Sequence, residues 1–380
     1  QNPLKFTKNP IPFSTSYWRC NIMASAFVVL LVLQLLQQVN AKHSYEAEGG
    51  SRCDLYEGRW VFDDLHPLYG STHCPFIENI FNCQKNGRPD KLYQQYRWQP
   101  SACNLPRFSA EDFLQRFKDK RIMFIGDSLS LNQWQSLACM LHTAMPHSEF
   151  TIEMPPLKYT TERTLSTFTF PQYNVSVMFE RNVFLVDIEK EGSWQVLKLN
   201  SVKDTKLWEG MDVLIFNTWH WFIHTGNLQP WDFIQDGEHT YRDMNRYVAF
   251  EQALETWARW VDETIHPSNT KVFFQGISPT HFNASLWGFH EGKNCSREMR
   301  PLPAPPRFSH PAEVIVEKVL QSMSKPVHLL NITKLSQQRT DAHPSVYGYG
   351  AQNGMDCSHW CLAGVPDAWN ELLYAELIRN

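Results

Sequence analysis

Four short apolar runs, separated by stretches with helical periodicity, most strongly constrain the fold of this chain. Each run has the length and composition of a buried strand. The runs lie at residues 121–125, 211–216, 271–274 and 326–330. Strands that alternate with helices predict a parallel sheet with both faces covered. We therefore expect an α/β fold, a three-layer α/β/α sandwich with a parallel central sheet.

Helical patterns are clearest in three places. Residues 129–141 directly follow the first apolar run, apolar residues recur at helical spacing from Met244 to Ile265, and residues 367–378 are amphipathic. Asp367 follows a proline and is expected to cap the last helix. Residues 167–202 interrupt the alternation with Thr, Phe and Val at nearly every second position, which predicts a small antiparallel insertion.

Residues 51–104 have a different character from residues 105–380. They contain four cysteines and many Pro, Gly and aromatic residues, without a long helical period. Such a segment is too small to form a core of its own. We expect a loop-rich N-terminal module, stapled by disulfides and packed on a main domain formed by residues 105–380.

The beginning of the chain predicts entry into the secretory pathway. Residues 1–22 contain no Met, and we interpret them as non-native leader sequence before a natural start at Met23. Residues 23–41 contain a short apolar run and then small residues, as in a signal peptide, whereas a membrane span needs about 20 apolar residues. The alternative is an uncleaved signal anchor, which would be the only membrane contact. Either way, the bulk of the protein is expected to be lumenal or extracellular.

The cysteine count agrees with this compartment. Cys20 precedes Met23, and the eight cysteines that remain fit four disulfides, although the residues alone leave the pairing open. The alternative, buried free thiols, is disfavoured by four glycosylation sequons. The sequons begin at Asn174, Asn283, Asn294 and Asn331.

Charge and composition exclude several classes of protein. The 35 Lys and Arg residues against 39 Asp and Glu give a formal net charge of −4, which argues against a nucleic-acid partner. Hydrophobic residues make up 43% of the chain, which excludes a disordered chain. No set of His, Cys and Asp stands at convincing ligand spacing, so we expect no metal site.

The segment Gly126-Asp127-Ser128 follows the first strand and opens the first helix. This placement exposes the Ser128 hydroxyl at the carboxyl edge of the sheet, where open α/β sheets bind ligands. Helix N-terminal N–H groups beside the hydroxyl could then stabilise an oxyanion. The alternative is that Ser128 only caps the helix. Asp127 is expected to brace the turn rather than to react.

A serine nucleophile needs a base, and the base needs an orienting carboxylate. Asp356 and His359 stand three residues apart in a loop that contains Cys357 and Cys361. One turn could let the carboxylate hold the imidazole and deliver both groups to Ser128. The alternative is a disulfide-rich loop with a surface histidine, but the pairing with Gly126-Asp127-Ser128 favours the catalytic interpretation.

Together, Gly126-Asp127-Ser128-Leu129 and Asp356-x-x-His359 resemble motifs of the plant trichome birefringence-like family. Further matching segments extend the resemblance over nearly the whole chain after the signal segment. They start at Cys53 (Cys-Asp-Leu-Tyr-Glu-Gly-Arg-Trp-Val), Arg88 (Arg-Pro-Asp), Tyr96 (Tyr-Arg-Trp-Gln-Pro) and Asp341 (Asp-Ala-His-Pro-Ser). The short N-terminus is more similar to the pectin-associated branch than to the xylan-associated one. Two positions depart from the family pattern, Ala363 where Pro is usual and Phe222 where Trp is common.

The resemblance implies an SGNH (GDSL-like) esterase domain that works as a polysaccharide O-acetyltransferase. It implies Ser128 as nucleophile, His359 as general base and acid, and Asp356 as its orienter. The oxyanion would lie at the Ser128 backbone N–H and the Asn217 side chain, unless Asn217 is only a turn residue. His220 and His343 are either groove residues or buried structural histidines. The family also implies the disulfides Cys53–Cys103, Cys74–Cys139, Cys83–Cys361 and Cys295–Cys357.

Two other functions stay open at this point. A wall polysaccharide acetylesterase, with pectin as substrate, would use the same triad with water as acceptor, and a polysaccharide-binding protein would keep the fold without catalysis. The transferase reading implies xylan or pectin as acceptor and no bound cofactor. It also implies an acetyl donor, acetyl-CoA or a relayed acetyl group, and a membrane partner that delivers acetyl. The expected location is the Golgi lumen, or secretion to the wall.

Overall fold

The computed structural model describes residues 53–156, 160–283, 294–296, 299–303, 309–348 and 354–379. Residues 54–380 form one compact unit. The expected leader (1–22) and signal segment (23–41) lie outside the described residues, as does Cys20. Within these described ranges, no helix has both the length and the apolar character needed to cross a membrane.

Seven strands form the central sheet, in the order β13-β12-β9-β3-β6-β5-β4. The strands from β13 to β6 run parallel, whereas β5 is antiparallel to β6 and β4 is antiparallel to β5. The strands are β3 (Arg121–Gly126), β4 (Thr151–Glu153), β5 (Leu165–Phe170), β6 (Val175–Arg181), β9 (Val213–Phe216), β12 (Lys271–Gln275) and β13 (His328–Leu330). The four predicted runs are β3, β9, β12 and β13, so the predicted α/β fold class is confirmed.

The antiparallel strands predicted over residues 167–202 are present, but they join two different sheets instead of forming one small insertion. β5 and β6 extend the central sheet, with β6 beside β3. The next two strands join a second sheet, in the order β11-β10-β8-β7. Its strands are β7 (Asp187–Glu191), β8 (Trp194–Lys198), β10 (Phe233–Asp236) and β11 (His239–Tyr241). A local alternation predicts a strand but not which sheet it joins, because pairing depends on distant partners.

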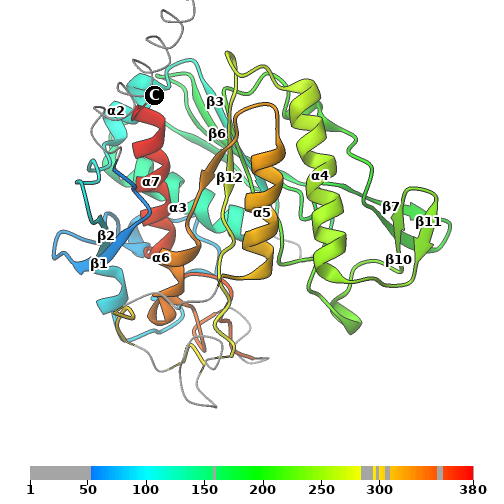
Figure 1. Ribbon diagram of the computed structural model, residues 1–380. Helices are drawn as coiled ribbons and strands as arrows, with labels where there is room; N and C mark the ends of the chain where they lie inside the picture. Colours follow the sequence, from blue (N-terminus) through cyan, green and yellow to red (C-terminus); the bar gives the residue numbers. More distant parts are fainter. Residues whose placement is uncertain are drawn as a thin grey trace, which may run out of the picture. The chain divides into compact units, whose positions relative to one another are not determined.

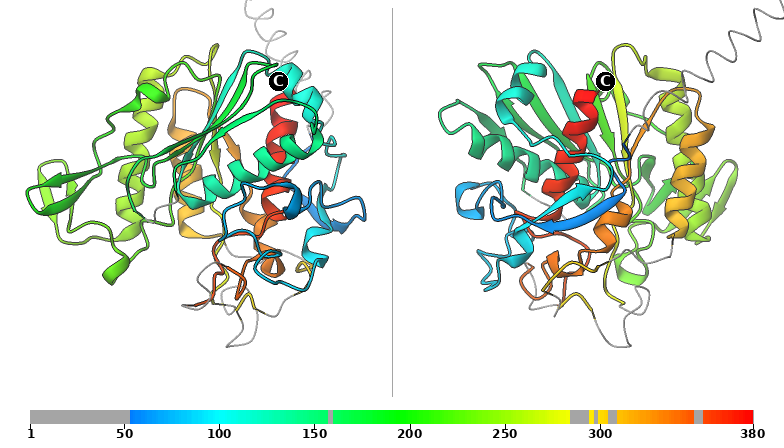
Figure 2. Two further views of the ribbon diagram at one scale, coloured as in Figure 1. Left: turned by 180° about the vertical axis from the view of Figure 1, so that it is seen from behind. Right: turned by 60° about the vertical axis from the view of Figure 1, so that its left-hand side comes forward.

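Helices cover both faces of the central sheet (Figures 1 and 2). The helices α3 (Ser128–Ala144) and α7 (Val365–Arg379) pack on one face, and α4 (Arg246–Thr264) and α5 (Pro311–Ser322) pack on the other. Successive side chains of β3 therefore enter different cores. Ile122 and Phe124 join the core beneath α3 and α7, whereas Met123 and Ile125 join the core beneath α4 and α5.

The predicted cap of the last helix needs correction. α7 begins at Val365, so Asp367 lies in its first turn rather than before it. Its Oδ2 accepts the backbone N–H of Gly364 at 2.8 Å, which is the reach-back half of a capping box. Its Oδ1 accepts the hydroxyls of Tyr69 at 2.8 Å and Ser136 at 2.6 Å. The carboxylate therefore joins the N-terminal module, α3 and α7.

The N-terminal module packs on the main domain, as expected for a segment without its own core. Its strands β1 (Gly58–Phe62) and β2 (Tyr96–Pro100) pair antiparallel. Its apolar side chains, among them Phe81 and Trp98, belong to the same core as α3 and α7. Among the described residues, the other helices are α2 (Ala110–Arg116), α6 (Thr333–Gln337) and the 3₁₀ turns η1 (Ser71–His73), η2 (Leu92–Gln94), η3 (Thr205–Leu207), η4 (Gly226–Leu228) and η6 (Thr340–Ala342).

Candidate active site

Ser128 stands where β3 gives way to α3. β3 ends at Gly126, and α3 begins at Ser128 with Asp127 as its N-cap. Asp127 Oδ1 accepts the Leu129 backbone N–H at 2.9 Å, so Asp127 is the capping residue and braces the turn. The alternative role of Ser128 as the cap is therefore excluded. Its hydroxyl remains available for another partner.

The turn depends on glycine at position 126 because neighbouring groups approach its Cα closely. A Cβ on Gly126 would lie 2.5 Å from the Asn217 carbonyl oxygen and 2.5 Å from Ser130 Oγ. Real Cβ atoms do not approach other atoms so closely, so any larger residue would push β9 away from the end of β3.

The loop between η6 and α7 brings a histidine and a carboxylate to Ser128. His359 Nε2 lies 2.8 Å from Ser128 Oγ, and His359 Nδ1 lies 2.7 Å from Asp356 Oδ2. An ionised carboxylate only accepts, so Nδ1 carries the proton and Nε2 accepts the Ser128 hydroxyl. Asp356 Oδ1 also accepts the backbone N–H groups of Ser358 and His359, each at 3.0 Å. The structure therefore brings Ser128, His359 and Asp356 together in the order of a nucleophile, a base and an orienting acid.

Charges around the imidazole raise the pKa of His359. Burial opposes protonation of His359, but the Asp356 carboxylate outweighs burial, so the pKa of His359 lies above its ordinary value of 6.5. Burial likewise opposes ionisation of Asp356, but His359 and the N–H donors of the turn lower its pKa. Asp356 therefore remains ionised and keeps the imidazole in one tautomer.

Two disulfides flank the histidine turn. Cys357 bonds to Cys295 and Cys361 bonds to Cys83, while Cys74 bonds to Cys139 farther from the turn. These are three of the predicted pairs, and Cys53 and Cys103 are also disulfide-bonded, as the fourth requires. The bonds attach both sides of the turn to distant segments, which restricts its movement.

The N-terminal module supports this loop directly. The Arg88 guanidinium donates to the carbonyls of Asp341 at 2.6 Å and His343 at 2.9 Å. It also pairs with the Asp90 carboxylate at 2.8 Å. The Phe81 ring lies 5.5 Å from the His359 ring, centroid to centroid. Arg88 and Asp90, which in the sequence only matched a family motif, therefore support the histidine loop through these contacts.

Asn217 is buried beside the turn that holds Ser128. It follows β9 directly, is fully buried, and its amide makes no hydrogen bond to any described residue. The backbone N–H of Asn217 donates to the Ile125 carbonyl at 2.9 Å, which fixes it beside the nucleophile turn. A turn residue would satisfy local backbone groups with its side chain, and Asn217 does not.

The two histidines named as groove candidates differ in position. His343 is fully buried, so it does not line a groove. His220 Nδ1 lies 3.7 Å from Asp127 Oδ2, close to the nucleophile turn. Burial opposes ionisation of Asp127, but His220 and the Leu129 N–H lower its pKa.

Sequence reasoning missed two residues near the site. Arg181 lies opposite Gly126 in the parallel pair of β6 and β3, and its charge opposes protonation of His359. Its position could not be inferred from the sequence, because the alternation in residues 167–202 does not show that β6 pairs with β3. His281 contacts His343 beneath the histidine loop, and no sequence motif marks it.

The four sequons lie outside the triad. Asn174 and Asn283 are exposed, whereas Asn294 and Asn331 are partly buried. Asn174, in the turn that connects β5 and β6, also donates to Asp119. Among the described residues, no cluster of three or more His, Cys, Asp or Glu side chains is placed to hold a metal ion.

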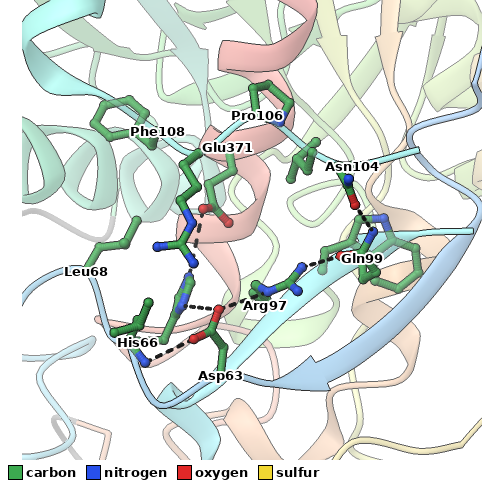
Figure 3. Close-up of a pocket in the computed structure, with 13 residues that line it drawn as sticks. Asp63, His66, Leu68, Arg97, Gln99, Asn104, Pro106, Phe108 and Glu371 are labelled. Carbon is green, nitrogen blue, oxygen red and sulfur yellow. Dashed lines mark hydrogen bonds and ion pairs between the residues drawn. The ribbon is translucent and has the colours of Figure 1, made fainter.

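A cavity of about 290 Å³ lies between the β1–β2 pair, residues 104–108 and α7, and no triad residue lines it (Figure 3). Its polar side chains largely bond one another. Asp63 accepts Arg97 Nε at 2.9 Å, Arg97 donates to Gln99, and Gln99 donates to Asn104. His66 lies between Asp63 and Glu371 at ion-pair distances of 3.7 and 3.8 Å. The cavity is therefore a feature of the N-terminal module, separate from the triad.

Comparison with family models gives two matches along the chain. The GDSL/SGNH-like acyl-esterase family found in Pmr5 and Cas1p matches residues 105–376. The PMR5 N terminal domain matches residues 51–104. Together the two matches cover the described part of the chain almost completely.

Curated relatives from Arabidopsis thaliana match over most of the chain. Protein trichome birefringence-like 43 is 50% identical over 93% of this chain and 96% of that protein. Protein trichome birefringence-like 41 is 51% identical over 93% of this chain and 97% of that protein. Protein trichome birefringence is 37% identical over 91% of this chain and 59% of its own length.

Proposed function

Because the chain belongs to the trichome birefringence-like family and carries a GDSL/SGNH-like acyl-esterase domain, we propose that it is an O-acetyltransferase of plant cell-wall polysaccharides. The observation that carries the proposal is the continuous set of contacts from Ser128 Oγ through His359 to Asp356, at 2.8 and 2.7 Å. These are the contacts that activate a serine for acyl transfer.

In the first half-reaction the serine takes an acetyl group from the donor. Ser128 Oγ forms a bond to the acetyl carbonyl carbon while His359 Nε2 takes the hydroxyl proton. The carbonyl electron pair moves to oxygen and gives a tetrahedral intermediate. When this intermediate collapses, the bond to the donor group breaks, and His359 returns the proton to that leaving group. The product is an acetyl ester on Ser128.

In the second half-reaction a sugar hydroxyl of the polysaccharide replaces the donor. His359 Nε2 removes the proton of this hydroxyl as its oxygen attacks the acetyl-Ser128 carbonyl. The second intermediate collapses by breaking the bond to Ser128 Oγ, which recovers its proton from His359. One histidine serves both steps because each leaving group receives the proton that the preceding nucleophile gave up.

The oxyanion of both intermediates is assigned to the Ser128 backbone N–H and the Asn217 amide. The N–H lies in the first turn of α3, where it has no carbonyl partner within the helix and adds to the positive end of the helix dipole. Support for Asn217 comes from its burial without a hydrogen-bond partner beside this turn. A preorganised donor of this kind is worth about 10²–10³-fold in rate.

The acceptor is proposed to be xylan or pectin, and the donor to be acetyl-CoA or a relayed acetyl group delivered by a membrane partner. The disulfide-rich fold is consistent with the secretory pathway, and the Golgi lumen is the proposed site of action. Acetyl-CoA is made in the cytosol, so a lumenal transferase needs delivery across the membrane.

The test uses the full chain secreted from plant cells, with Ser128→Ala and the exposed control Ser101→Ala. Each protein is incubated with acetyl-CoA, or with an activated acetyl ester, and de-esterified xylan or pectin oligosaccharides, and in parallel with acetylated oligosaccharides. Mass spectrometry follows the acetyl number. A gain that requires Ser128 but not Ser101 supports the transferase and names its polymer. A loss from the acetylated set without any gain makes the protein an esterase, and no change in either set from folded protein contradicts both.

A further inference from the structure

The imidazole of His343 lies directly beneath the proposed general base. His343 Nδ1 is 2.6 Å from the backbone carbonyl oxygen of His359. A carbonyl oxygen only accepts, so His343 Nδ1 carries a proton and donates it. In a neutral ring this leaves Nε2 as an acceptor.

A second buried histidine occupies that acceptor. His281 Nδ1 lies 2.5 Å from His343 Nε2, so with both rings neutral His281 Nδ1 is the donor of this contact, and His281 also has a hydrogen bond with the Gln337 backbone. The backbone N–H of His281 also donates to the Cys357 carbonyl at 2.8 Å. The two histidines therefore form a chain of hydrogen bonds in which His281 donates to His343 and His343 donates to the His359 carbonyl.

Both rings are held in place and kept neutral by their surroundings. His343 stacks on Trp360, with ring centroids 4.0 Å apart, and Trp360 Nε1 donates to Ser278 Oγ at 2.9 Å. Both histidines are almost completely inaccessible to solvent. Burial lowers the pKa of His343 to about 4 and the pKa of His281 well below its ordinary value.

We propose that His281 and His343 are positioning residues, and that their hydrogen-bond relay fixes the backbone carbonyl of His359 so that its imidazole stays aligned between Asp356 and Ser128. Asp356 already holds the backbone N–H of His359 at 3.0 Å, and His343 holds its carbonyl. With both backbone groups fixed, the ring can move only by rotation about its two side-chain bonds. This inference rests on the proposed function of His359 as the base.

The first test compares two substitutions of His343. His343→Asn retains an N–H donor at the position of Nδ1, whereas His343→Leu fills the space without a donor. We expect His343→Leu to lower kcat about 10²-fold with KM almost unchanged, the cost of misplacing a catalytic group by about an ångström. His343→Asn should recover most of that loss. His239→Leu, at an exposed histidine of β11, is the matched control.

A second measurement does not depend on activity. Long-range proton–nitrogen NMR spectra of wild-type protein labelled in histidine report the tautomer of each ring. The relay requires both His281 and His343 to be neutral with the proton on Nδ1 at neutral pH. In folded His343→Leu, the Nδ1 proton of His359 should also lose the downfield shift that its contact with Asp356 produces.

Three results would overturn the relay: a proton on Nε2 of His343, wild-type kcat in His343→Leu, or equal losses in the Asn and Leu variants. The proposed function fails separately, if Ser128→Ala remains as active as wild type. In that case the tautomers and the His359 Nδ1 shift still decide whether the relay exists and positions the ring.

Discussion

The imidazole of His359 lies 2.8 Å from the hydroxyl of Ser128, although 231 residues separate them in the sequence. Ser128 opens α3 just after a buried strand, and His359 lies in a loop before the last helix. Neither segment alone contains both the hydroxyl and the imidazole that contacts it. The catalytic potential of the protein therefore depends on how well the fold keeps these two segments in register.

Replacing the orienting acid tests the assigned tautomer. Asp356→Asn places an amide N–H against His359 Nδ1, so Nδ1 becomes an acceptor and the imidazole proton moves to Nε2. A protonated Nε2 cannot accept the Ser128 proton. We expect kcat to fall about 10³–10⁴-fold with a small change in KM. Steady-state kinetics of Asp356→Asn and of the exposed control Asp64→Asn decide this. A loss below tenfold would contradict the assigned role.

The pH profile of kcat/KM reports the charge balance at His359. The base must be neutral to take the serine proton, and its pKa lies above 6.5, so activity should rise with pH through an apparent pKa above that value. Arg181 opposes protonation of His359, so in Arg181→Gln the rise of kcat/KM with pH should shift to higher pH. A shift of this rise to lower pH would refute this electrostatic account.

Gly126→Ala tests the close approach beside the nucleophile turn. The added Cβ would lie 2.5 Å from the Asn217 carbonyl, so β3 and β9 must separate. We expect about a 10²-fold loss of kcat and about 1–3 kcal/mol less stability towards urea. Gly70→Ala is the matched control, because its Cβ would meet only side-chain atoms, the closest at 3.1 Å. Equal behaviour of the two variants would mean that the turn tolerates the methyl group.

Arg88→Lys tests the support that the N-terminal module gives to the histidine loop. A single ammonium group cannot reach the carbonyls of Asp341 and His343 and the Asp90 carboxylate together, so buried acceptors lose their partner. We expect the free energy of unfolding to fall by about 2–4 kcal/mol. Urea titration measures this, with the exposed Arg107→Lys as control. Unchanged stability would show that the module merely covers the loop.

The buried carboxyl of Asp367 should make stability depend on pH. Burial raises its pKa from 3.8 to about 6, so the folded protein binds this proton more tightly than the unfolded chain. The resulting stabilisation is fully present below pH 3.8 and is lost as pH rises through about 6. Between these values wild type should lose up to about 3 kcal/mol relative to Asp367→Asn, which does not titrate.

Urea titrations of both proteins between pH 4 and pH 7 measure this difference. The stability difference between the two proteins should change across this range, because only wild type releases a proton at position 367. A constant difference across the range would mean that the pKa of Asp367 is not raised.

The local parts of the site could be predicted from the sequence because neighbouring residues determine them. A buried strand, a glycine and a helix start place Ser128 at a sheet edge, and three-residue spacing lets Asp356 reach His359 within one turn. The four parallel strands followed from apolar runs flanked by helical patterns. The disulfide pairs followed only from the family resemblance, since spacing alone leaves many pairings possible.

Only the tertiary structure decided which distant groups meet. It placed β6 beside β3 and so brought Arg181 opposite Gly126, and it gave the cap of α3 to Asp127 and not Ser128. It also put Asp367 inside the first turn of α7, bonded to Tyr69 and Ser136, and buried His281 and His343 beneath the base. Strand order and the partners of buried polar groups depend on packing between segments far apart in the chain. The sequence by itself therefore determined the chemical groups and their local turns, and the tertiary structure determined their partners.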